Sequence, residues 1–203
     1  CTFCTEGQNF WNKVKRKKPE LVAKEIRYIS EIMTNIVNDN VRSDLLIADS
    51  NFGMFKDDIE VCKIIANEQE KFGYPTYINV ATGKNRKERV LEAAKLVNGA
   101  MKLAGSVQSL DEDVLKNIKR NNISGEQIID LALDASKIGA NTYSEVILAL
   151  PGDSLEKHFD TLKQLVEASF NTISTYQLMI LPGTELGLDS TKRKYNMVSK
   201  YRV

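Results

Sequence analysis

The chain has 203 residues, enough for one substantial hydrophobic core, and its 42% apolar and 27% charged residues are ordinary for a folded domain. Its formal net charge is +1, so no overall field attracts nucleic acid or an anionic membrane, and we expect neither as a partner. No apolar run is long enough to span a bilayer, no signal peptide is visible, and the three cysteines do not make a disulfide framework, which together predict a cytoplasmic protein.

The chain begins with two thiols, Cys1 and Cys4, in the stretch CTFC. By itself this pair allows four interpretations: a disulfide, two buried apolar side chains, half of a zinc site, or part of an iron–sulfur site. Zinc would need a second pair of ligands, and Cys62 and His158 are isolated from each other in the sequence. We expect Cys62 to be a core thiol on the apolar side of a helix, and His158 to lie at the surface.

After a polar segment with a basic run at 13–18, predicted to be a solvated linker, helix and strand patterns alternate along the chain. The predicted helices cover 19–37, 57–72, 86–97, 109–120, 124–138 and 153–168, and the predicted strands cover 45–48, 76–82, 101–108, 143–150 and 172–178. The run 45–48 is continuously apolar, which predicts a strand buried on both faces, and 179–181 is predicted to be core.

Three of these helices carry a start signal in the sequence. Ser109, Ser124 and Asp153 each stand three residues before a glutamate or glutamine, which predicts that they cap the helices that follow. Strands that alternate with helices form right-handed βαβ units, so the fold class is α/β with a parallel sheet or barrel.

In parallel α/β folds the ligand site lies at the carboxyl ends of the strands. Polar side chains fall near several of these ends, namely Asp49, Asn51, Gln108, Ser109 and Glu145. We expect them to converge on one rim beside the thiol pair. Each has a structural alternative: Asp49 and Asn51 are common turn residues, Ser109 is a candidate helix cap, and Glu145 would need an ion-pair partner if buried.

Several segments together resemble the radical SAM superfamily, and within it the branch that often carries a cobalamin-binding domain upstream. The CTFC stretch resembles the last two cysteines of the C-x3-C-x2-C loop of that superfamily, with Phe3 as its aromatic residue. The other matching segments are 48–53 (ADSNFG), 107–110 (VQSL) with 115–120 (LKNIKR), 145–153 (EVILALPGD) and 181–185 (LPGTE). The likeness covers essentially the whole chain, although Ala149 replaces a glycine that is often seen there.

The resemblance implies a partial TIM-like (β/α)6 barrel of the radical SAM type, with the first strand and the first cysteine of the triad missing from this chain. Residues 1–203 would then be one radical SAM core domain, truncated at its N-terminus. We expect such a fragment to hold no intact cluster by itself, and its open edge at strand 45–48 to need a partner or a covering loop.

The resemblance also implies a ligand set. Cys1 and Cys4 would be two of the three thiolate ligands of a [4Fe–4S] cluster, whose open iron takes S-adenosylmethionine. The remaining implied contacts are Phe3 near the adenine, Asp49 and Asn51 at the methionine ammonium, Arg120 at its carboxylate, and Gln108, Ser109 and Glu145 at the ribose hydroxyls.

The implied reaction is reductive cleavage of S-adenosylmethionine to a 5′-deoxyadenosyl radical, for cobalamin-linked methylation or rearrangement of an unknown small-molecule substrate. Cobalamin would be held by an upstream domain, and a flavodoxin or ferredoxin would donate the electron. Two alternatives stay open from the sequence: a cobalamin-independent radical SAM enzyme, of the methylthiotransferase or oxidative decarboxylase kind, and a non-catalytic α/β module with structural zinc.

Overall fold

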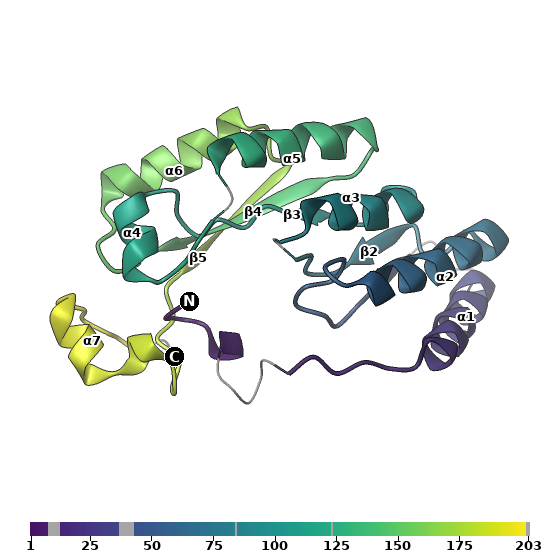
Figure 1. Cartoon of the computed structure of the whole chain (residues 1–203), viewed down its shortest axis with the longest axis horizontal. Helices are drawn as coiled ribbons and strands as arrows, with labels where there is room; N and C mark the ends of the chain where they lie inside the picture. The colour runs from purple at the N-terminus through teal and green to yellow at the C-terminus, as the bar shows by residue number, and fades with distance from the viewer. Residues whose placement is uncertain (8–12, 37–42, 84, 123, 202–203) are drawn as a thin grey trace.

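The computed structural model describes residues 1–7, 13–36, 43–83, 85–122 and 124–201. Within them helices and strands alternate along the chain, as the sequence predicts (Figure 1). The strands are β1 (Asp44–Leu46), β2 (Tyr77–Asn79), β3 (Leu103–Ala104), β4 (Thr142–Leu148) and β5 (Thr172–Gln177). The helices are α1 (Pro19–Asn35), α2 (Lys56–Phe72), α3 (Lys87–Leu96), α4 (Glu112–Asn117), α5 (Gly125–Lys137), α6 (Leu155–Glu167) and α7 (Asp189–Lys194), with short 3-10 turns η1 (Thr5–Gly7) and η2 (Glu185–Gly187).

The structure confirms one of the three helix caps predicted from the sequence. The capping box predicted at Ser124 is present at the start of α5. The predictions for Ser109 and Asp153 are wrong, because Asp111 caps α4 and Ser154 caps α6. In both cases a second capping residue follows the expected one and stands directly before the first helical turn.

All strand pairs are parallel, and the strands follow one another in chain order. β1 pairs with β2, β3 with β4 and β4 with β5, while an isolated parallel bridge between Ile78 and Met101 joins the two sets. β3 is shorter than predicted, but a further bridge between Gln108 and Val146 continues its path along β4. Among the described residues no pairing joins β1 to β5, so the barrel is not closed.

The sheet has a covered face and an open face. In Figure 1 α2, α3, α5 and α6 lie along one side of it, α1 packs outside α2, and α7 lies apart at the lower left. Burial alternates along β4, where Ser144 and Val146 are fully buried and Glu145 between them is half-buried. Leu46 and Met179, both predicted to be buried, are 70% exposed, because no opposing wall of the barrel covers them among the described residues.

The described residues form three apolar core clusters. The first packs α1, α2 and α3 on β1 and β2 and contains the fully buried Cys62, which confirms that this thiol is a core residue. Burial raises the pKa of Cys62 to about 12, so it stays a neutral thiol and is a poor metal ligand. The second cluster lies between β4 and α6, and the third lies under the cysteine loop.

His158 is buried in α6, so the expectation that it lies at the surface is wrong. Its Nδ1 atom is 3.7 Å from the carboxylate of Asp153, whose own pKa burial raises. Nearby, Thr161 accepts a hydrogen bond from the backbone N–H of Leu110. These contacts hold the segment before α4 and the turn after β4 against α6. Within the described residues, no helix has the length and apolar character that crossing a bilayer requires.

A substitution at Ala149 tests the backbone conformation of the turn after β4. It has a φ of 67°, and its side chain is exposed, so its methyl group strains the backbone without packing in the core. We predict that Ala149→Gly raises the free energy of unfolding by roughly 0.5–1 kcal/mol, which is the relief of that strain less the entropy cost of glycine. Urea unfolding of the purified protein measures the change.

Ala81→Gly is the matched control, because Ala81 is also exposed and outside the regular elements but has no positive φ. We expect it to lower the free energy of unfolding by roughly 0.5–1 kcal/mol. Equal destabilisation by both substitutions would contradict the left-handed conformation at Ala149.

Candidate functional site

The cysteine loop is pinned between two segments that lie far from it in the sequence. The backbone N–H of Thr2 donates to the carbonyl of Ile118 at 3.0 Å, and the N–H of Leu186 donates to the carbonyl of Thr2 at 2.9 Å. The N-terminus therefore lies beside the end of α4 and the segment after β5 (Figure 1). In this position Cys1 is exposed and Cys4 is half-buried, and both are free thiols.

Arg120 links this loop to the ends of the strands. Its Nη1 donates to the sulfur of Cys1 at 3.6 Å, its Nη2 to the carbonyl of Ser106 at 2.5 Å, and its Nε to the side chain of Asn122 at 2.8 Å. Burial lowers the pKa of Arg120, and the negative charges of Glu145 and Cys4 oppose that shift. An arginine remains cationic at neutral pH even so, and a cation here favours the thiolate form in which cysteine binds metals.

Glu145 faces the same region from β4. Its Oε2 accepts a hydrogen bond from the hydroxyl of Ser106 at 2.9 Å, which supplies the partner that a half-buried carboxylate needs. The backbone beside it is also bonded to Gln108, whose N–H donates to the carbonyl of Glu145 at 2.8 Å. Gln108 has a φ of 66°, an uncommon conformation for a residue with a side chain. Segment 106–109 is therefore held against β4 by a side-chain hydrogen bond and by backbone hydrogen bonds.

Two predicted residues form the loop after β1. Asp49 Oδ1 accepts a hydrogen bond from the backbone N–H of Asn51 at 2.7 Å, so the interpretation of Asp49 as a turn residue is confirmed. The side chain of Asn51 is exposed. Between them Ser50 donates to the carboxylate of Glu6, from the turn after the cysteines, at 2.5 Å. This contact brings the loop after β1 beside the cysteine loop.

Phe3 and Ser109 lie deeper in the structure. Phe3 is half-buried and packs against the third apolar cluster, which consists of Val114, Ile118 and Leu150. Ser109 is 3% exposed, and its hydroxyl accepts from the N–H of Asp111 at 3.2 Å. Both side chains are thus engaged in contacts within the protein, Phe3 with apolar residues and Ser109 with the backbone at the start of α4.

Three further residues connect the site, and the sequence gives no distinguishing signal for them. Ser106 binds both Arg120 and Glu145, and Glu6 binds the loop after β1. Asn122 binds Arg120 and two backbone carbonyls of the loop before α4. A serine, a glutamate and an asparagine in loops are ordinary solvent-exposed types, so only their three-dimensional contacts identify them.

The donor set at this position is compatible with an iron–sulfur group. Two free thiols stand beside a guanidinium, and thiolates are the usual ligands of such clusters. The part of the chain that the structure describes holds no group of three or more His, Cys, Asp or Glu side chains placed for a metal ion, so these two thiols form an incomplete ligand set for a cluster and for structural zinc alike.

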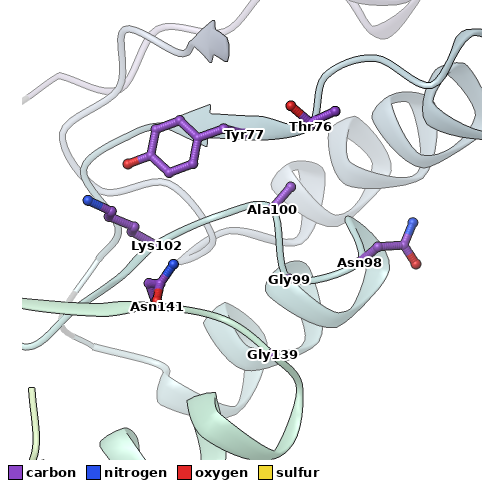
Figure 2. A pocket seen from close by; sticks show the side chains of 8 residues that line it. All are labelled: Thr76, Tyr77, Asn98, Gly99, Ala100, Lys102, Gly139 and Asn141. Carbon is purple, nitrogen blue, oxygen red and sulfur yellow. The ribbon is translucent and has the colours of Figure 1, made fainter. Parts of the chain in front are cut away.

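Among the pockets formed by the described residues, two lie at opposite ends of the strands. One of about 270 Å³ opens at the amino ends of β2 and β4 and is lined by residues such as Tyr77, Lys102 and Asn141 (Figure 2). The other, of about 510 Å³, lies at the carboxyl ends and is lined by Gly83, Ala104 and Asn122, among others. The second pocket adjoins the residues described above, and the first does not.

Comparison with known proteins gives two curated relatives that cover nearly all of the chain, while no family model matches it. The chain is 29% identical over 201 residues to the cobalamin-dependent radical SAM methyltransferase TokK of Streptomyces tokunonensis, covering 97% of this chain and 28% of that protein. It is 32% identical over 190 residues to the 2-(S-pantetheinyl)-carbapenam-3-carboxylate methyltransferase of Streptantibioticus cattleyicolor, covering 92% and 27%. The chain thus spans little more than a quarter of the length of each relative.

Solved structures agree on the fold. The radical S-adenosylmethionine methyltransferase TsrM from Kitasatospora setae, with cobalamin and a [4Fe–4S] cluster bound, superposes with a TM-score of 0.74 at 14% identity, covering 93% of this chain and 34% of that one. Methylornithine synthase superposes with a TM-score of 0.60 at 17% identity, covering 92% and 51%. With two relatives aligned along nearly the whole sequence and this shared fold, the chain is similar to the cobalamin-dependent methyltransferases of the radical SAM superfamily.

Proposed function

We propose that the protein is a radical SAM enzyme that cleaves S-adenosylmethionine reductively and transfers a methyl group to a small-molecule substrate with the help of cobalamin. Residues 1–203 would act as its core domain. The observation that carries this proposal is the hydrogen-bonded path from Cys1 through Arg120 and Ser106 to Glu145. That path joins the thiols to the carboxyl ends of the strands, where α/β enzymes of this kind bind their ligands.

In this proposal Cys1 and Cys4 hold two irons of a [4Fe–4S] cluster. When bound, the cluster supplies one electron that breaks a carbon–sulfur bond of S-adenosylmethionine and yields a 5′-deoxyadenosyl radical. The task of the chain is to bind and orient the reactants. Arg120 would pair with the methionine carboxylate, and because its Nε and Nη2 already bind Asn122 and Ser106, the contact would come from the Nη1 side.

The remaining predicted contacts are compatible with the geometry described above. Gln108 and Ser109 follow β3, and the N–H of Gln108 binds the carbonyl of Glu145 within β4, so these three residues would bind the ribose hydroxyls from neighbouring strands. Oε2 of Glu145 accepts the hydrogen bond from Ser106, so Oε1 would accept from a ribose hydroxyl. Asp49 uses Oδ1 in its turn, so Oδ2 would accept from the methionine ammonium beside Asn51. Phe3 would form an apolar wall near the adenine.

The substrate and partners are proposed at the level of chemical class. TsrM has been solved with tryptophan and a SAM analogue, and the second curated relative is named for a carbapenam carboxylate. A small organic molecule on the open face of the sheet is therefore the proposed substrate here. A flavodoxin or ferredoxin would donate the electron, and a cytoplasmic location suits three free thiols.

The first test is chemical. We predict that the full-length protein, loaded anaerobically with iron and sulfide and then reduced, forms 5′-deoxyadenosine from S-adenosylmethionine. Product analysis by liquid chromatography and mass spectrometry measures it, with Cys4→Ala as the variant expected to lose iron and all product. A loaded, reduced cluster that forms no 5′-deoxyadenosine would refute the proposed function.

Arg120 is tested by its effect on affinity. Arg120→Gln removes a charged donor worth about 1.5–3 kcal/mol, so we predict that the Kd for S-adenosylmethionine rises by about 10- to 100-fold. Equilibrium binding to the cluster-loaded protein measures it. Lys119→Gln is the control, since Lys119 forms an exposed ion pair with Glu185 at 2.7 Å and we expect a change below about twofold. Equal losses in both variants would point to unspecific loss of positive charge.

A further inference from the structure

Asn122 lies in the segment between α4 and α5, and its amide group is fully engaged. Its Nδ2 donates to the carbonyls of Val107 and Ser109, both at 2.8 Å. Its Oδ1 accepts from Nε of Arg120, also at 2.8 Å. A side chain that donates twice and accepts once in this arrangement has to be a primary amide, because a carboxylate has no hydrogens to give.

The two carbonyls that Asn122 binds flank Gln108. Gln108 has a φ of 66°, a conformation that costs a residue with a side chain free energy and persists only where the surroundings enforce it. The backbone of Gln108 is fixed from the other side by β4, because its N–H binds the carbonyl of Glu145 and its carbonyl accepts from Ile147 at 3.0 Å. Asn122 and β4 therefore hold this residue between them.

The oxygen of the Asn122 amide orients the guanidinium group of Arg120. With Nε on Asn122 and Nη2 on the carbonyl of Ser106, the plane of the guanidinium is fixed at two points. The remaining nitrogen, Nη1, is then directed to the sulfur of Cys1 at 3.6 Å. One side chain thus orients both the strained segment around Gln108 and the cation beside the cysteine.

We propose that Asn122 is a positioning residue that sets the orientation of Arg120 and the conformation of Gln108 together, so that binding of S-adenosylmethionine depends on its amide. This inference rests on the proposed function. Its action is indirect, through the two residues that would touch the cofactor. Asn122 is half-buried and lines the pocket of about 510 Å³, so water can reach the two carbonyls when the side chain is shortened, and the fold survives.

The test compares Asn122→Ala and Asn122→Asp with Asn117→Ala in the full-length protein. Asn117 is the matched control, because its Nδ2 also clamps a backbone carbonyl, that of Pro151 at 3.0 Å, but on the turn after β4. Amide hydrogen exchange of the cluster-free protein reports on the clamp itself. We expect Asn122→Ala to speed exchange in segment 106–111, and Asn117→Ala to leave that segment unchanged.

The second arm measures the Kd for S-adenosylmethionine from the change in the electron paramagnetic resonance spectrum of the reduced cluster. We expect Asn122→Ala to raise this Kd by about tenfold, the loss of roughly one oriented charged hydrogen bond. Asn122→Asp should raise the Kd further, because a carboxylate cannot donate to the two carbonyl oxygens and is repelled by them. Asn117→Ala should stay within about twofold of the unsubstituted protein.

Two results would overturn the inference. One is an unchanged Kd in Asn122→Ala despite faster exchange in 106–111, since the amide would then be only structural. The other is an unchanged exchange rate of segment 106–111 in Asn122→Ala, since the amide would then not stabilise the conformation of that segment. Failure of the proposed function is distinguishable, because the cluster of the unsubstituted protein would then not respond to S-adenosylmethionine, and the exchange arm would still decide whether Asn122 holds the loop.

Discussion

One half-buried arginine, Arg120, joins the parts of this molecule that the proposed chemistry needs. Arg120 reaches from the end of α4 to the cysteine loop and to the loop before α4, and its three nitrogens bind three different groups. Burying a guanidinium is costly, and the cost is offset because each nitrogen finds an acceptor and the charges of Glu145 and Cys4 lie nearby. Arg120 thus adds to the contact between Ser50 and Glu6, which joins the turn after the cysteines to the loop after β1.

The parallel sheet makes this arrangement of Arg120, the thiols and the strand ends possible. All strands are parallel, so their carboxyl ends share one edge, and the loops that follow β1, β3 and β4 meet there. The covered face is stabilised by apolar packing against α2, α3, α5 and α6, which leaves the open face free for polar side chains such as Glu145. The same openness explains why apolar residues such as Leu46 are exposed.

Much of the fold could be predicted from the sequence, because alternating helix and strand patterns allow few arrangements other than a parallel α/β fold. The errors have physical causes. The apolar run around Leu46 indicates a strand but cannot indicate whether a second wall covers it. Ser109 and Asp111 both have the chemistry of a cap, and local sequence does not decide between them. His158 is buried beside Asp153, a neighbour that depends on how the turn after β4 meets α6 and that no local pattern indicates.

The candidate site was predictable only in part. The family resemblance indicated Arg120 and Glu145 as ligand-binding residues, and the structure places both near the thiols through Ser106. Asn122 was not predictable, because its importance lies in three hydrogen bonds that no local pattern encodes.

The most direct measurement is an anaerobic crystal structure of the full-length protein with the cluster and S-adenosylmethionine bound. We predict that Cys1 and Cys4 each bind an iron, that the methionine carboxylate lies at Nη1 of Arg120, and that Asn122 keeps its three hydrogen bonds. Cysteines bound to zinc, or S-adenosylmethionine bound away from Arg120 and Glu145, would contradict this account.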